Sequence, residues 1–222
     1  MEKKQTNHMI TNLLIILLIG VNVLVSYKGF NDRAFFSKYM FQIGRIQQGE
    51  NIRMISSAFL HADVTHLIFN MLTLYIFAPI VINYFNPIVF LIIYFLSLLA
   101  GNFFTLNQHK NEPNYSAIGA SGAVTGIVYG SIVIYPEMSL YLFFIPIPIP
   151  AYIFAIGYIL YSLYGMRKQL GMIGHSAHIG GAVGGLIATI LFDFNLILTN
   201  YLFIFLMLVP LIFYFMISNE KD

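Results

Sequence analysis

Ser121 lies in a cluster of small residues, 119–122, where a polar segment meets an apolar stretch. A serine hydroxyl becomes a nucleophile when a neighbouring base accepts its proton. Glycine then recurs every four residues, at Gly122, Gly126 and Gly130, which would let another helix approach closely. The cluster therefore suits either nucleophilic catalysis or simple helix packing.

His178 is the candidate base. It follows Ala177, which forms with Gly181 and Gly185 a second stripe of small residues at four-residue spacing. Two such stripes are natural packing partners, and their contact would bring His178 within reach of Ser121. A polar residue inside an apolar span indicates a functional site by default. Taken alone, His178 could equally be a hydrogen-bonded packing residue.

A third cluster supplies side-chain N–H donors. Asp63 is a suitable N-cap for the apolar stretch that follows it, and His66 and Asn70 would share one face of that helix. Donors held at low dielectric constant could stabilise the oxyanion of a tetrahedral intermediate, with about 3–4 kcal/mol from one good donor. The alternative is that His66 and Asn70 only hydrogen-bond between helices.

The composition around these clusters is that of a membrane protein. The chain has 222 residues, of which 59% are hydrophobic and 9% charged, whereas soluble domains carry about a quarter charged residues. Cysteine is absent, which excludes disulfides and thiolate metal sites. A formal net charge of +2 is too small to indicate nucleic acid as a partner.

Apolar segments of about 20 residues can cross a bilayer as helices. By this measure we expect an all-α, polytopic membrane helix bundle that forms a single domain over residues 1–222. The first segment resembles a signal peptide, but no small-residue cleavage site follows it, so we expect it to be retained. The predicted spans lie at residues 9–27, 62–83, 87–106, 118–135, 150–166, 175–193 and 199–217.

Three connections have distinctive sequences. Residues 28–60 hold seven of the 20 charged residues, more than any other connection, and are expected to fold on the membrane surface. Residues 144–150 alternate proline, which forbids a continuing helix and predicts an extended run. Residues 166–174 carry two basic residues and two glycines, and could form either a mobile lid or an inert loop.

Together the three clusters resemble the rhomboid family of intramembrane serine proteases. The family pattern places a histidine and an asparagine on the second helix with three residues between them, GxSG on the fourth helix and AHxxGxxxG on the sixth. Here it reads as His66 with Asn70, then residues 119–122, then residues 177–185, in the same order. The resemblance covers a rhomboid-like six-helix core of about residues 10–194, and residues 199–217 would be an extra seventh helix.

The resemblance implies a serine endopeptidase that cleaves transmembrane segments through an acyl-enzyme. Transmembrane proteins would be its substrates and the lipid bilayer its surroundings, with no obligate partner, no metal and no cofactor. The dyad would have no acidic third member, and the Ser121 backbone N–H would join the oxyanion donors. The implied roles are catalysis for Ser121 and His178, oxyanion or substrate stabilisation for His66, Asn70 and Gly119, and helix packing for Gly122, Gly126, Gly181 and Gly185.

Two positions depart from the family pattern. The family often has tryptophan before the arginine of the first loop, whereas Ile52 precedes Arg53 here. The family also often has an aromatic ring four residues after the serine, stacked on the histidine, whereas this chain has Thr125. The sequence therefore leaves open which group orients His178.

Two other classes of function stay open. One is a rhomboid-like pseudoprotease that binds client helices without cutting them. The other is a transporter or channel in which histidines bind a metal or relay protons, although the acidic intramembrane residues that such carriers use are missing. The histidines concerned are His61, His66, His175 and His178.

The expected location is a bacterial cell membrane, because no transit peptide is evident. The family orientation implies a cytoplasmic N-terminus and an active site towards the outer side. Only Lys3 and Lys4 of the eleven Lys and Arg residues would then lie inside, which is opposite to the positive-inside rule. We keep the family orientation as the expectation because the two lysines precede the first helix.

Overall fold

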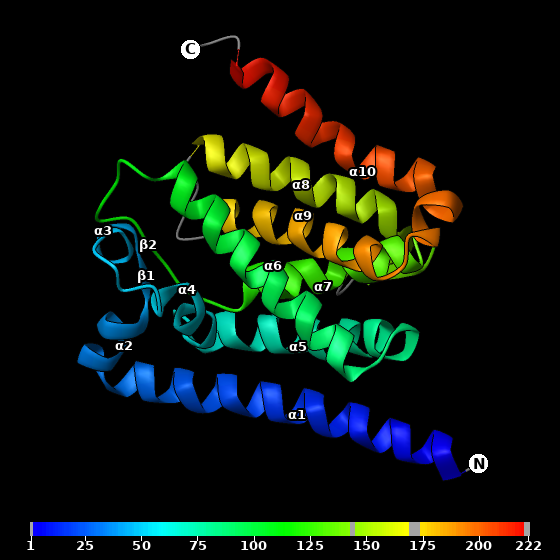
Figure 1. Cartoon of the computed structure of the whole chain (residues 1–222), viewed down its shortest axis with the longest axis horizontal. Coiled ribbons are helices and arrows are strands. Elements are labelled where there is room, and N and C mark those ends of the chain that lie inside the picture. The colour runs from blue at the N-terminus through cyan, green and yellow to red at the C-terminus, as the bar shows by residue number, and fades with distance from the viewer. Residues whose placement is uncertain (1, 143–144, 169–173, 220–222) are drawn as a thin grey trace.

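Seven long helices form the body of the protein, in a computed structural model that describes residues 2–142, 145–168 and 174–219 (Figure 1). Each corresponds to one predicted span, so the expected all-α membrane bundle is confirmed. The helices are α1 (Glu2–Asn31), α5 (Val64–Tyr84), α6 (Pro87–Gln108), α7 (Ser121–Ile134), α8 (Ala151–Lys168), α9 (His175–Phe192) and α10 (Asn195–Asn219).

Helix length distinguishes α7 from its neighbours. Over the described residues, five stretches are long and apolar enough to cross a membrane, whereas α7 is apolar but only 14 residues long. Its start at Ser121 is later than the predicted residue 118, because Gly119 has a φ of +112° that no α-helix accommodates. The five stretches are Asn12–Asn31, Val64–Tyr84, Pro87–Gln108, His175–Phe192 and Asn195–Tyr214.

The centre of the bundle is built from α6, α7 and α9, which pack on one another. A Cβ atom at Gly181 would overlap the backbone of Gly122, and one at Gly185 would overlap the backbone of Gly126. The two glycine stripes thus allow α7 and α9 to meet backbone to backbone. Figure 1 shows α1 along one side of the bundle, next to α5, and α10 on the opposite side, next to α8.

The segment between α1 and α5 is folded, as its mixed composition predicted. Its short β1 pairs antiparallel with β2, which immediately precedes the Ser121 cluster, with Phe41 opposite Ala117. Phe41, Ile43 and Ile46 form a small separate core beneath this pairing. The elements are α2 (Arg33–Tyr39), β1 (Phe41–Gln42), α3 (Ile43–Gln47), α4 (Arg53–Ser56), the 3₁₀ turn η1 (Ser57–Phe59) and β2 (Ser116–Ala117).

Arg53 holds this insertion together from within. The residue is only 4% exposed, and its Nε donates to Glu50 Oε2 at 2.7 Å. One terminal nitrogen donates to the carbonyls of Ser37 and Met40, at 2.8 and 2.7 Å. A buried arginine with these partners ties α2 to α4, since each bond to a charged donor is stronger than a neutral one.

The proline-rich run is extended, as predicted, and forms a hairpin at the opposite end of α7. β4 (Ile145–Pro150) pairs antiparallel with β3 (Ser139–Leu142), an interaction that the sequence did not indicate. Residue 144, the first of the predicted run, lies outside the described residues. So do residues 169–173 of the segment for which a lid or an inert loop was expected.

Candidate active site

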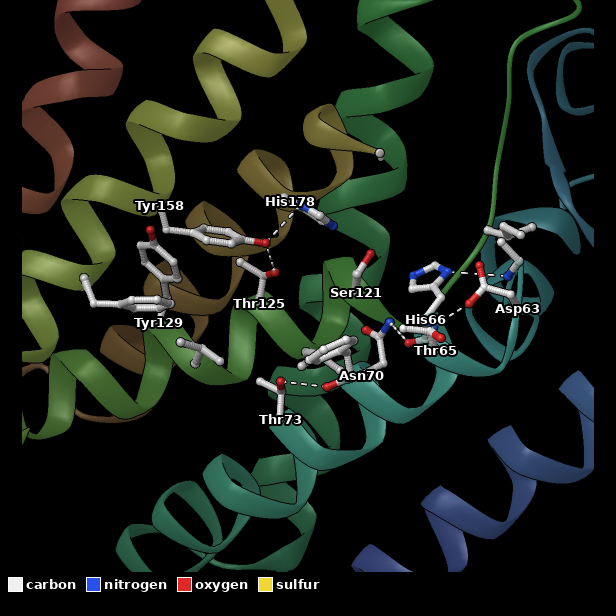
Figure 2. Close-up of a pocket in the computed structure, with 17 residues that line it drawn as sticks. Asp63, Thr65, His66, Asn70, Thr73, Ser121, Thr125, Tyr129, Tyr158 and His178 are labelled. Carbon is white, nitrogen blue, oxygen red and sulfur yellow. Dashed lines mark hydrogen bonds between the residues drawn. The ribbon is translucent and has the colours of Figure 1, made fainter. Parts of the chain in front are cut away.

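A cavity of about 520 Å³ opens where α5, α7 and α9 begin. Its wall is made by residues of α5, α7, α8 and α9 together with the segments just before them. Ser121, His178, His66 and Asn70 all line it, although they lie far apart in the sequence (Figure 2). The structure therefore brings the serine, the histidine and the N–H donors into one space.

The local backbone explains why Ser121 faces this cavity. Ser121 is the first residue of α7, so its own N–H has no acceptor within the helix. Before it, the Gly119 N–H donates to the Ser57 carbonyl at 3.0 Å. A Cβ at Gly119 would stand 2.7 Å from Cε1 of His66, and its positive φ disfavours any other residue. Gly119 thus sets the turn and leaves room for the His66 ring.

The His66 ring is oriented by the chain before α5. The Asp63 side chain accepts from the His66 backbone N–H at 2.8 Å, which confirms Asp63 as the N-cap. The Ala62 N–H approaches His66 Nδ1 at 3.4 Å, so Nδ1 is the acceptor and Nε2 carries the proton. The His66 Nε2–H is therefore available as a donor beside Gly119.

Asn70 follows His66 by one turn of α5. Its Nδ2 donates to the His66 carbonyl at 3.0 Å and has a second hydrogen on the same nitrogen. Because Asn70 also lines the cavity, that second hydrogen can serve a bound oxygen. With the Ser121 N–H, the site has three N–H donors of the kind that stabilises an oxyanion.

His178 is held by a tyrosine that the sequence analysis did not select. Nδ1 of His178 lies 3.0 Å from the Tyr158 hydroxyl, which in turn lies 3.4 Å from Oγ1 of Thr125. The rings of Tyr158 and His178 have centroids 5.8 Å apart and an interplanar angle of 30°. No motif indicates a tyrosine at this position, because the contact depends on how α8 packs against α9.

Ser121 and His178 face each other across the cavity without a direct bond. Within the described part of the chain, no hydrogen bond joins the Ser121 hydroxyl to His178. Figure 2 shows the His178 ring between the Tyr158 and Ser121 hydroxyls, with its second nitrogen on the Ser121 side. Catalytic hydrogen bonds are often long in the absence of substrate and shorten in the complex. The missing bond is therefore compatible with a nucleophile and its base.

His61 contacts the residue before Ser121 and does not line the cavity. The Ser26 hydroxyl donates to the Phe59 carbonyl at 3.0 Å, so His61 Nδ1, 2.8 Å away, must donate to the Ser26 oxygen. Nε2 of His61 then accepts the Ala120 N–H at 3.5 Å. Burial lowers the pKa of His61 to about 3, with neighbouring His66 as a second cause. A neutral His61 therefore links α1 to the residue before Ser121.

The positions of the histidines bear on the metal-binding alternative. Across the residues that the structure describes, no three His, Asp or Glu side chains come together as a metal-ion site would require. His175 is buried, with its ring centroid 5.3 Å from that of Tyr161 and 6.3 Å from that of His178. These positions give no specific support to the transporter alternative.

Comparison with known proteins gives a family match for most of the chain. A family model described as "Rhomboid domain" matches residues 48–195. Over 188 residues the chain is 29% identical to "RHOMBOID-like protein 12, mitochondrial" of Arabidopsis thaliana, covering 78% of this chain and 56% of that protein. Over 179 residues it is 28% identical to "Rhomboid protein 1, mitochondrial" of Saccharomyces cerevisiae, covering 78% and 51%. The chain thus spans about half the length of the curated relatives it matches.

Proposed function

The chain belongs to the rhomboid family, and from this premise we propose that it is a serine endopeptidase that cuts transmembrane segments of other proteins within the bilayer. Its apolar helices and its family make it a multi-pass membrane protein. The observation that carries the proposal is the shared cavity, in which Ser121, His178 and the donors of His66 and Asn70 meet. A site for acyl transfer needs these three kinds of group together.

In the proposed reaction, the Ser121 oxygen attacks the scissile carbonyl while His178 Nε2 accepts the serine proton. The oxyanion receives N–H donors from the Ser121 backbone, Asn70 and His66. Collapse of the tetrahedral intermediate gives an acyl-enzyme, and His178 returns its proton to the leaving amine. Water then repeats the attack and releases the new carboxyl end.

The shape of the cavity supports a substrate that enters from the side. Its walls include Phe69 and Thr73 of α5 and Phe154 and Tyr158 of α8, so it extends between these two helices. A substrate helix hides its carbonyls in its own hydrogen bonds and must unwind before attack. We therefore expect cleavage near small or helix-breaking residues of the substrate.

The decisive experiment uses the purified protein in liposomes with a generic transmembrane substrate. We expect cleavage by the wild-type protein that Ser121→Ala and His178→Ala both abolish and that chelators leave intact. Ser116→Ala, an exposed serine in β2, is the matched control and should cleave normally. Absence of cleavage across several substrates would instead favour the pseudoprotease, and loss of activity on chelation would favour a metal-dependent function.

The compartment and orientation form a separate part of the proposal. We retain a bacterial cell membrane with the cavity towards the outer side, although the names of the two relatives place those proteins in mitochondria. Because the chain has no cysteine, labelling of one introduced cysteine shows on which side of the membrane that position lies. Asn51→Cys, at the cavity end, should react with an impermeant thiol reagent in intact cells, and Asn83→Cys, at the opposite end, should not. The reverse pattern would invert the orientation.

A further inference from the structure

The Tyr158 hydroxyl lies 3.0 Å from Nδ1 of His178, within the range of a good hydrogen bond. Tyr158 belongs to α8 and His178 to α9, so the bond crosses between two helices. His178 is 9% exposed, which leaves its ring few other polar partners. The direction of this bond decides which ring nitrogen carries the proton, since a neutral imidazole has one donor and one acceptor.

A general base must present an unprotonated Nε2 to Ser121. Nδ1 must then carry the proton and donate it to the Tyr158 oxygen. The phenol needs an acceptor for its own hydrogen, and Oγ1 of Thr125 lies 3.4 Å from it. A donor chain therefore runs from His178 through Tyr158 to Thr125, from α9 across α8 to α7, and Figure 2 shows both bonds.

We propose that Tyr158 is the positioning residue of the dyad, which fixes the His178 ring and keeps its proton on Nδ1; this proposal rests on the protease activity proposed above. Among the described residues that line the cavity, the one carboxylate is Asp63, which caps α5. No acidic group is therefore placed to orient the imidazole as in a triad. The phenol oxygen accepts a neutral hydrogen bond from Nδ1–H of His178 and so stabilises that tautomer. Thr125, one turn after Ser121 in α7, accepts the hydrogen of the phenol.

The test compares Tyr158→Phe with the wild type. The substitution keeps the ring and removes only the hydroxyl, so ring packing is retained. Tyr164→Phe, on the exposed face of the same helix, is the matched control. We expect Tyr158→Phe to lower kcat about three- to tenfold, the range for one neutral hydrogen bond, with KM changed less than about twofold.

A spectroscopic measurement separates this role from a merely structural one. The ¹⁵N chemical shifts of labelled histidine distinguish a proton on Nδ1 from one on Nε2, and His178→Ala assigns the signal. We expect the Nδ1–H form in the wild type and a shift towards Nε2–H in Tyr158→Phe. Thr125→Val removes the acceptor of the phenol and should shift the proton in the same direction, which keeps the test valid if Tyr158→Phe folds poorly.

The outcomes distinguish this proposal from the proposed function. If the wild type cleaves but Tyr158→Phe has the same kcat and the same tautomer, Tyr158 is not a positioning residue while the protease stands. If the wild type does not cleave, the protease fails. In that case the tautomer still tests the role of Tyr158. A proton on Nδ1 in the wild type that moves to Nε2 in Tyr158→Phe supports the positioning of His178 by Tyr158. A proton on Nε2 in the wild type overturns it.

Discussion

The Asn70 side-chain nitrogen donates a 3.0 Å hydrogen bond to the backbone carbonyl of His66, one turn earlier in α5. This bond uses one hydrogen of the amide and fixes where the other can point. If that hydrogen serves the oxyanion, Asn70→Ala should lower kcat about 10²- to 10³-fold with little change in KM. Kinetics in liposomes test this, with Asn83→Ala as the exposed control at the other end of α5. A fall in kcat below about threefold would remove Asn70 from the oxyanion site.

Gly119→Ala should damage both stability and activity. The φ of +112° disfavours alanine, at a cost of about 1–3 kcal/mol, and the new Cβ would displace the His66 ring. We expect a lower Tm and a lower kcat. Gly157→Ala in α8, where a Cβ meets nothing within 4 Å, should leave both unchanged or raise the Tm slightly. Normal kinetics in Gly119→Ala would show that the His66 position is not critical.

Gly181→Ala tests the contact between α7 and α9. Its Cβ would overlap the Gly122 backbone, so the helices must separate, with a loss of about 1–3 kcal/mol in the free energy of unfolding. Because Ser121 and His178 lie on these two helices, cleavage should fall more than the Tm predicts. Gly20→Ala, at an open position of α1, is the control. Unchanged stability in Gly181→Ala would contradict the close packing.

The stability of the fold should decrease in acid because of His61. Its pKa is about 3 in the folded protein, against about 6.5 in an unfolded chain. Between these values the unfolded state binds a proton that the folded state does not, so the free energy of unfolding falls as pH drops below about 6.5. Tm measured from pH 8 to 4.5 should fall less steeply in His61→Asn than in the wild type. Equal slopes would exclude His61 as a source of the acid sensitivity.

The helices could be predicted because the thickness of the bilayer sets the length of an apolar segment, whatever its exact residues are. The ends were less accurate: the fourth helix was expected from residue 118, but the positive φ of Gly119 delays it to Ser121. The run ending at Pro150 was expected to be extended, yet its partner strand Ser139–Leu142 was not expected. Local sequence marks where a helix cannot continue, whereas strand pairing depends on which segments meet.

In the site, too, local sequence patterns could be predicted and tertiary contacts could not. The spacing of Ser121, His178, His66 and Asn70 predicted residues that the structure places around one cavity, and their catalytic roles stay predictions. Tyr158 was not selected from the sequence, and His61 was considered only as a possible metal ligand or proton relay. Their contacts join α8 to α9 and α1 to the residue before Ser121, and such contacts follow from tertiary packing alone.

The shortness of α7 has a consequence for the fate of the products. Fourteen residues span about 21 Å, against about 30 Å for the hydrocarbon core of a bilayer. If the far end of α7 reaches one surface of the bilayer, Ser121 at its first turn would lie below the other surface, at the depth where the proposed cleavage takes place. Hydrolysis there would create a new carboxylate and a new amine at a depth where charge is expensive. Both new ends would move towards water, so the two fragments of the substrate would separate. This separation would suppress the reverse reaction.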